Sequence, residues 1–282
     1  MTDVSIIVPT RDRPDALARC LAALSAQRDL DALEIIVVDD GSAEVERLAK
    51  VVQRFTAARL LRTTGVGPAA ARNVGVAAST GQFVCFTDDD CEPASDWAAR
   101  LVESLVTGAD ATGGQTVNGL PDDVFVEASE LIVRELQDST LRRLGGHGVF
   151  IPTNNLASRR EVLHQHPFDE GYSRPAGEDR AWCASVASVG LQLRLEPRAV
   201  VVHRPALGWR QYWRQHVRYG HGAFRFAMRR PNRAWQEPPG FYLRLLREAL
   251  RISPTCLLLV LLAQVATAVG FISEAVRSEG RG

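Results

Sequence analysis

Residues 79–90 read STGQFVCFTDDD, an apolar run that ends directly in three carboxylates. The run at 83–86 has no polar residue, which is typical of a strand buried on both faces. The same arrangement occurs twice upstream, where IIVV at 35–38 ends in DDGS and SIIV at 5–8 ends in PTRD. Because ligands of open α/β sheets bind beyond the carboxyl ends of the strands, these three polar ends predict one shared site.

Further strands and helices alternate along the first hundred residues. We expect strands near 4–8, 34–38, 59–62 and 82–87, with helices beginning at Pro14 and covering 44–55, 68–78 and 96–106. The second half is less regular, with helices expected at 124–136 and 180–189, a strand or strand end at 150–157, and strands at 191–195 and 199–202. This order predicts an α/β fold with a mixed, mostly parallel sheet flanked by helices. A dinucleotide-binding fingerprint is excluded, because no G-x-G-x-x-G follows the first strand.

The charge of the chain is zero only as a sum. Its 282 residues include 33 basic and 33 acidic side chains, but residues 1–202 carry a net charge of −9 and residues 203–251 a net charge of +9. The ordinary composition excludes a disordered or collagen-like chain. An acidic body repels a phosphate backbone, so we expect no nucleic-acid partner, and the basic segment predicts an anionic surface instead.

Five scattered cysteines form no Cys-x-x-Cys pair, which argues against a zinc site or a disulfide framework and suits a reducing compartment. The strand-like run that directly follows Asp3 is unlike a secretory signal peptide. Residues 255–272 carry no charge, and this length is close to what a membrane-crossing helix needs. The segment is interpreted as a span, as an interfacial helix or as a buried core helix.

The triplet at 88–90 suits a hard divalent cation, because Mg²⁺ or Mn²⁺ takes one or two carboxylates together with a diphosphate. The alternative is a solvated acidic turn. Glu178 and Asp179 follow a glycine at a predicted helix start, and one of them could deprotonate an incoming hydroxyl. Capping of the helix explains the same two residues without any chemistry.

SIIVPTRDRP, IIVVDDGS, GPAAARNVGVAASTGQFVCFTDDD and GED, in this order, resemble the motifs of a family 2 glycosyltransferase. The resemblance covers roughly residues 3–205 and implies a GT-A fold, a Rossmann-like mixed sheet. It implies transfer of a sugar from a nucleoside diphosphate donor to a hydroxyl acceptor, with inversion and without a covalent intermediate. The acceptor expected is a cell-envelope glycan, a lipid or a secondary metabolite, a lipid-linked molecule being one candidate.

The resemblance also assigns residues to the donor. The nucleotide-binding residues it implies are Pro9, Thr10 and Arg11 around the nucleoside, Asp39 at the base, Arg72 at the diphosphate, and Asp88 at the ribose or the metal. The metal ligands it implies come from Asp88, Asp89, Asp90 and His203, and which two of the three acids bind is left open. For His203, a local hydrogen bond at a strand end is an equal alternative.

On the acceptor side, the resemblance implies Asp179 as the general base with Glu178 beside it, and Asn154, Asn155 and Trp182 near the acceptor. One departure matters. Processive members carry a Q-x-x-R-W motif, whereas here the stretch from Gln211 to Arg214 is followed by Gln215. We therefore expect a single addition rather than polymer synthesis. The rival functions are a non-catalytic nucleotide-sugar-binding protein and a nucleotidyltransferase of related fold, which normally begins with a glycine-rich phosphate loop.

Three parts are expected along the chain: a catalytic domain at 1–205, a basic amphipathic segment at 206–251, and an apolar helix with a tail at 252–282. In the second part, Trp209, Trp213, Val217, Gly220 and Phe224 form one helical stripe and Arg210, Arg214, Arg218, Arg225 and Arg229 another. This pattern favours an anionic membrane interface. Diphosphate binding by the arginines and a solvated helix face are the alternatives. The expected location is the cytoplasmic face of the cell membrane, through peripheral contact or one C-terminal span, with the cytoplasm as the alternative.

Overall fold

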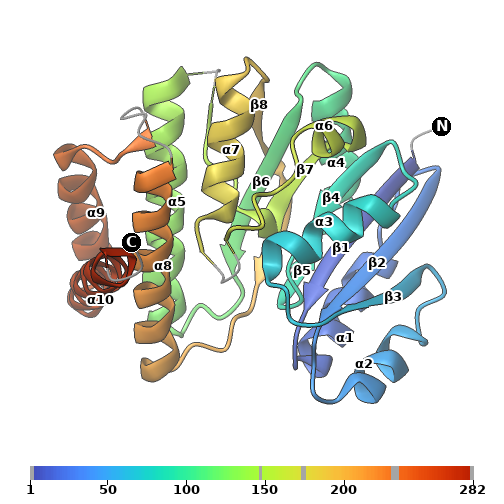
Figure 1. The fold of residues 1–282 in the computed structure, drawn as a ribbon, viewed down its shortest axis with the longest axis horizontal. Coiled ribbons are helices and arrows are strands. Elements are labelled where there is room, and N and C mark those ends of the chain that lie inside the picture. The colour runs from blue at the N-terminus through green and yellow to red at the C-terminus, as the bar shows by residue number, and fades with distance from the viewer. Residues whose placement is uncertain (1–2, 146–147, 173–175, 230–234, 280–282) are drawn as a thin grey trace.

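The fold is built on one eight-stranded mixed sheet (Figure 1). The structure is a computed structural model and describes residues 3–145, 148–172, 176–229 and 235–279. The strands are β1 (Asp3–Thr10), β2 (Ala32–Asp40), β3 (Ala58–Thr63), β4 (Phe83–Phe86), β5 (Cys91–Pro93), β6 (Ala111–Asn118), β7 (Leu156–Arg159) and β8 (Leu193–His203). Their spatial order is β3-β2-β1-β4-β7-β6-β8-β5. The first four strands in this order are parallel, whereas β7 is antiparallel to both neighbours and β5 is antiparallel to β8.

Helices cover both faces of this sheet. They are α1 (Pro14–Ser25), α2 (Val45–Val52), α3 (Pro68–Ala78), α4 (Trp97–Val106), α5 (Val124–Leu144), α6 (Arg160–Gln165) and α7 (Glu178–Ser188), with a 3-10 turn, η2, at Thr153–Asn155. Successive residues of β1 enter different cores: Ile6 packs with Leu17 and Leu21 of α1, and Ile7 packs with Ala71 of α3. Burial on both faces is the physical reason why the central strands are continuous apolar runs.

The second half of the sheet departs from the prediction in four places, one of them at 150–157, where only the last two residues belong to a strand, β7. β6 has the sequence ATGGQTVN, which has neither an apolar run nor an alternation, and it was not predicted. Its Gly114 lies where an added Cβ would be 1.9 Å from the carbonyl oxygen of Ala199, so the neighbouring strand leaves no room for a side chain. β5 has three residues and was also missed. The two strands expected at 191–195 and 199–202 are one continuous strand, β8.

Three helices follow the sheet: α8 (Trp209–Arg229), α9 (Pro239–Ile252) and α10 (Pro254–Glu279). Figure 1 shows them grouped with α5 beyond β6 and β8, on the side of the sheet opposite to α2 and β3. This group has a core of its own, which includes Leu131, Tyr212, Leu245 and Val260. α8 and α10 cross at Gly220, where an added Cβ would meet the Thr267 carbonyl oxygen at 2.0 Å.

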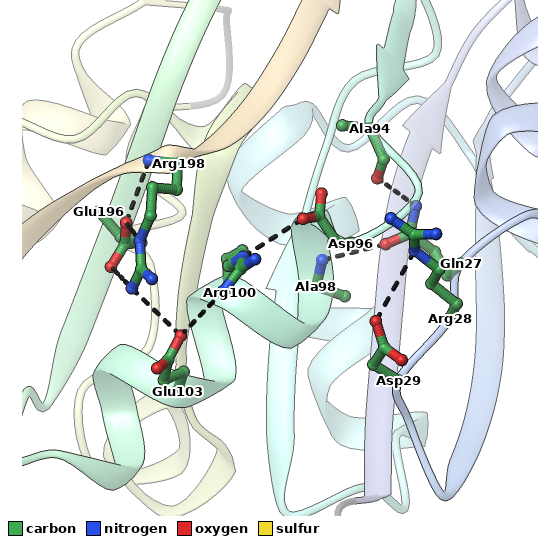
Figure 2. A network of polar contacts seen from close by, with 10 residues as sticks. All are labelled: Gln27, Arg28, Asp29, Ala94, Asp96, Ala98, Arg100, Glu103, Glu196 and Arg198. Carbon is green, nitrogen blue, oxygen red and sulfur yellow. Dashed lines mark hydrogen bonds and ion pairs between the residues drawn. The ribbon is translucent and has the colours of Figure 1, made fainter.

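A surface network of polar contacts fixes α4 on the face of the sheet (Figure 2). The side chain of Gln27 donates to the Ala94 carbonyl oxygen at 2.7 Å and accepts from the Ala98 amide at 3.0 Å, which joins the end of α1 to the start of α4. At the other end of α4, Glu103 pairs with Arg198 of β8 at 3.1 Å. The exposed ion pairs of this network are of the kind that contributes little to stability.

Candidate active site

The carboxyl end of β2 places two aspartates in different roles. Asp39 is fully buried, and its Oδ1 accepts from the Ser42 amide at 2.9 Å. Its Oδ2 has no hydrogen-bond donor among the described residues, and Arg62 Nε is 3.6 Å away. Asp40 accepts from Thr63 and from the amides of Val66 and Gly67, so it shapes the loop that leads into α3. A buried carboxylate oxygen without a donor is costly, and a ligand N–H is the group that would satisfy it.

The three acids after β4 also differ from one another. Asp89 is buried, accepts from Thr10 Oγ1 at 2.6 Å and pairs with Arg13 at 3.0 Å. Burial raises the pKa of Asp89 to about 6, although Arg13 opposes the shift. Asp88 and Asp90 are less buried and lie on either side of this anchored residue. Arg13 also pairs with Asp90, at 2.8 Å. The middle acid therefore differs from its neighbours in its deeper burial and in its bond to Thr10, which joins the ends of β1 and β4.

His203, the last residue of β8, lies beside Asp90. Its Nε2 is 3.4 Å from Asp90 Oδ1, and its Nδ1 is 2.5 Å from Oε1 of Glu130 on α5. Burial disfavours the protonated ring, but the hydrogen bonds with Asp90 and Glu130 outweigh it and raise the pKa of His203 to about 10. Ligand atoms of Asp90, Cys91 and His203 lie within 4.8 Å of one another. The Cys91 thiol is fully buried, and burial raises its pKa well above the ordinary value, so it stays protonated.

A single arginine, Arg72 of α3, connects the acidic triplet to the start of α7. It is 4% exposed and pairs through Nη2 with Asp88 at 3.1 Å and through Nη1 with Glu178 at 3.2 Å. Glu178 also accepts from the Ala176 amide at 2.9 Å, so both of its oxygens are occupied. Asp179 accepts a hydrogen bond only from the Arg180 amide, at 2.7 Å, among the described residues. Burial and the charge of Glu178 raise its pKa, which suits a carboxylate that takes up a proton.

Two of the three residues expected on the acceptor side are part of the core instead. Asn155 is fully buried, and both ends of its side-chain amide are hydrogen-bonded. Its oxygen accepts from Trp97 Nε1 and its nitrogen donates to the Ala199 carbonyl oxygen. Trp182 is also buried, stacks on Phe168 at 5.5 Å and donates to the His166 carbonyl oxygen. Asn154 is different, because its buried Oδ1 has no partner.

The structure adds two residues to the site that the sequence reasoning missed. Arg13 pairs with Asp89 and Asp90, and Glu130 pairs with His203. Arg13 is part of the SIIVPTRDRP motif, so its position directly after the first predicted strand is the signal that marks it.

The stripe of Trp209, Trp213, Val217, Gly220 and Phe224 is free only in part, because Trp209 is 55% exposed whereas Gly220 and Phe224 pack on α10. Gly220 packs on the backbone of α10, and Phe224 contacts Phe271 with ring centroids 5.2 Å apart. In the arginine stripe, Arg225 pairs with Glu274 and Arg229 pairs with Asp169. Much of the predicted amphipathic pattern of α8 therefore reflects packing within the protein.

The sheet order, with carboxylates gathered at one edge beside a helix that starts with an acidic pair, defines a GT-A fold. A family profile described as glycosyl transferase family 2 matches residues 5–166, which is more than half of the chain. The chain belongs to this family.

Relatives and solved structures agree with this assignment. The pre-mycofactocin glycosyltransferase of Mycobacterium tuberculosis is 29% identical over 244 residues, which are 82% of this chain and 49% of that protein. The amylovoran biosynthesis glycosyltransferase AmsB of Erwinia amylovora is 29% identical over 62% of each chain. The chain thus spans about half to two thirds of the length of these curated relatives.

Among solved structures, the mannosyltransferase PcManGT from Pyrobaculum calidifontis, in complex with GDP-Man and Mn²⁺, has a TM-score of 0.59 and 24% identity. The likeness covers 99% of this chain and 79% of that one, so it includes the C-terminal helices. Glucosyl-3-phosphoglycerate synthase from Mycobacterium tuberculosis, in complex with Mn²⁺, UDP and glucosyl-3-phosphoglycerate, has a TM-score of 0.58, with 20% identity over 81% of this chain and 80% of that one.

Proposed function

We propose that the protein is a metal-assisted, inverting glycosyltransferase that adds one sugar from a nucleoside diphosphate sugar to a hydroxyl acceptor. The acceptor oxygen forms a bond to the anomeric carbon as the bond from that carbon to the diphosphate breaks. The hydroxyl proton passes to the carboxylate of Asp179, and the nucleoside diphosphate leaves. The observation that carries the proposal is the Arg72 bridge, which joins Asp88 on the donor side to Glu178 beside Asp179.

The donor half is supported by the end of β2. Oδ2 of Asp39 has Arg62 at 3.6 Å but no hydrogen-bond donor among the described residues, so it is suited to accept from a ring N–H of the base. Pro9 and Thr10 of β1 lie beside β2 in the sheet, and Arg11 follows them. Arg11 is largely exposed and Arg72 is buried, so each can reach a different part of a nucleotide. Arginine suits this role because its guanidinium forms paired hydrogen bonds with phosphate oxygens.

The residues present fit Mg²⁺ or Mn²⁺. Asp88 and Asp90 offer hard oxygen ligands, and His203 offers a nitrogen once its ring has lost its proton. Asp89 is the most buried of the three acids and is hydrogen-bonded to Thr10. Glu130 holds the other nitrogen of His203, as carboxylates commonly do for metal-binding histidines. When bound, the cation neutralises the charge that develops on the departing diphosphate.

Inversion is supported by the unequal state of the two acids at α7. Glu178 is neutralised by Arg72 and occupied by a backbone amide, so it is not free to attack carbon. Asp179 is the remaining carboxylate and has the raised pKa that a base needs. Asn154, with its unsatisfied Oδ1, is the residue we assign to the acceptor side.

A panel of donors tests this function. The protein is incubated with Mn²⁺ and UDP-glucose, UDP-galactose, UDP-N-acetylglucosamine, GDP-mannose or dTDP-rhamnose, and the released product is measured. We expect slow Mn²⁺-dependent release of the nucleoside diphosphate from one donor and a rise in melting temperature with that donor. Release of pyrophosphate would support a nucleotidyltransferase, and donor binding without any cleavage or transfer would support a non-catalytic binding protein.

We also propose that α9 and α10 place the protein on the cytoplasmic face of a membrane. α10 is long and apolar enough to cross a bilayer, with a mean hydropathy of 2.3 in its most apolar window, of which 28% is buried. The side of α10 that is not buried carries an uncharged exposed stripe of Leu258, Leu261, Val265, Val269, Ile272 and Val276. Leu243 and Leu250 of α9 are exposed as well. Exposed apolar surface of this extent is typical of a membrane or protein contact.

Charge supports a membrane rather than a protein partner. Arg210 and Arg214 of α8 are exposed and have no ion-pair partner among the described residues, which favours anionic headgroups. Because one side of α10 packs on α8, α9 and α5, interfacial binding fits better than an isolated span. All five cysteines are buried and free, in keeping with a reducing compartment.

Vesicle sedimentation tests the membrane proposal. We expect the protein to sediment with phosphatidylglycerol vesicles and the triple variant Leu258→Glu, Val265→Glu and Ile272→Glu to stay in solution. Val106→Glu, at an equally exposed apolar position on α4, is the matched control and should still sediment. Wild-type protein that remains in solution with these vesicles would contradict the proposal and would favour the alternative location in the cytoplasm.

A further inference from the structure

The position of Asp179 depends on the backbone of the first turn of α7. Its carboxylate accepts only from the amide of the next residue, so no distant side chain holds it directly among the described residues. Where the carboxylate points is therefore set by whatever fixes residues 176–180. Small errors in the placement of a catalytic group cost large factors in rate, so these contacts matter for turnover.

Two contacts fix the start of this turn. Arg72 holds Glu178 from the sheet side, as described above. On the other side, Gly177 has a left-handed backbone with φ of 93°, and an added Cβ there would lie 3.1 Å from the carbonyl oxygen of Gly222 on α8. An added Cβ on Gly222 would in turn lie 2.4 Å from the Ala176 carbonyl oxygen. The two backbones are thus in direct contact, and α8 forms one wall of the turn.

A third contact comes from still further along the chain. Glu237, which precedes α9, pairs through Oε1 with Arg180 Nη2 at 2.9 Å and with Arg143 Nη2 of α5 at 2.9 Å. Its Oε2 accepts from Ser139 Oγ at 2.6 Å, and its side chain is only 6% exposed. Both of its oxygens are therefore committed, one to α7 and α5 and the other to α5.

Arg180 is held by contacts other than its pair with Glu237. Arg180 donates to the Trp235 carbonyl oxygen as well as to Glu237, and its guanidinium lies over the ring of Phe226 at 5.0 Å from the centroid. Burial lowers the pKa of Arg180, which Glu237 opposes. Buried ion pairs rarely add net stability compared with apolar packing, whereas a planar guanidinium with several acceptors fixes geometry.

We infer that Glu237 is a positioning residue that acts through Arg180 to orient Asp179. The inference rests on the proposed role of Asp179 as the base. It means that the segment beyond residue 205 completes the active site, through Gly222 and Glu237, rather than serving only as an anchor. The site would then depend on the C-terminal helices even when no membrane is present.

The test compares Glu237→Gln with a matched control. Glu274→Gln removes a similar arginine partner, because Glu274 pairs with Arg225 at 2.9 Å between α8 and α10 without touching α7. Turnover of UDP-glucose with Mn²⁺, or of the donor that the panel above selects, is measured well below the melting temperature of each variant. We expect Glu237→Gln to lower kcat at least tenfold with the donor KM within twofold, and Glu274→Gln to change neither by more than twofold.

Glu237→Asp keeps the charge and should recover part of the lost kcat. A kcat for Glu237→Gln within twofold of wild type, or a loss equal to that of the control, overturns the inference. If Glu237→Gln does not fold, Arg180→Lys replaces it, because lysine keeps the charge but not the paired hydrogen bonds; wild-type kcat in that variant overturns the inference as well. Asp179→Asn distinguishes the proposed function from the role of Glu237. An active Asp179→Asn refutes the assignment of Asp179 as the base. An inactive Asp179→Asn together with a fully active Glu237→Gln refutes only the role of Glu237.

Discussion

Replacing Asp179 with asparagine should remove turnover while making the folded protein more stable. The amide keeps the shape of the side chain and can still accept from the Arg180 amide, so no packing or hydrogen bond is lost. It cannot take up the proton of an acceptor hydroxyl. General-base catalysis contributes about 10²–10⁴-fold in rate, and we expect kcat to fall by that factor while donor binding is kept.

The sign of the stability change follows from the raised pKa. Burial and Glu178 raise the pKa of Asp179 above its ordinary value of 3.8, so the folded protein holds this proton more tightly than the unfolded chain does. The contribution of this carboxyl to stability is therefore lost as the pH rises from about 3.8 through the folded-state pKa. Each unit of difference corresponds to about 1.4 kcal/mol, or very roughly 2–4 °C in melting temperature for a chain of this size. Asparagine avoids that loss.

Two measurements check this reasoning. Thermal melts of both proteins without added divalent cation, at pH 5, 6, 7 and 8, should show a melting-temperature difference that favours Asp179→Asn and grows with pH. Donor turnover at pH 7 should show the loss of kcat. A melting-temperature difference that does not change between pH 5 and 8 would mean that the folded protein does not raise the pKa of Asp179. A kcat within threefold of wild type would mean that another group is the base.

Three further substitutions probe the surroundings of the site. Arg72→Met leaves Glu178 buried without its partner, so urea unfolding should show a loss of about 3–5 kcal/mol, and a nearly unchanged stability would contradict the bridge. Asp39→Ala removes the buried oxygen that no hydrogen-bond donor satisfies among the described residues, so calorimetry should show donor affinity at least tenfold weaker; unchanged affinity would rule out a role at the base. Gly220→Ala overpacks the crossing of α8 and α10 and should cost about 1–3 kcal/mol, whereas Gly240→Ala, with open space around it, should cost nothing; equal effects would contradict the close crossing.

The C-terminal helices show how one pattern can have two causes. Trp213, Gly220 and Phe224 lie on one face of α8, and the sequence alone favoured a membrane interface for that face. In the folded chain Gly220 and Phe224 of this face meet α10, and the exposed apolar stripe lies on α10 itself. Periodicity identifies an apolar face, but the same face suits a lipid and a neighbouring helix equally well. Only the arrangement of the helices distinguishes the two.

The sequence by itself determined the first half of the fold and pointed to the acids of the candidate site. Strands such as 35–38 are apolar on both faces because both faces are buried, and a run of this kind followed by carboxylates is visible without any structure. The strand β6 could not be predicted in this way, because the glycines at its centre are required by the neighbouring strand rather than by local preference.

The tertiary structure alone decided what each acid does. Asp88, Asp89 and Asp90 are identical in sequence terms, and their roles differ because Arg72, Arg13 and His203 approach them from three separate elements. Glu237 is more than fifty residues from Asp179, yet it reaches the same turn of α7 through Arg180. Local sequence sets which residues are available as ligands and bases, whereas long-range packing sets their partners, and the partners set charge, pKa and orientation.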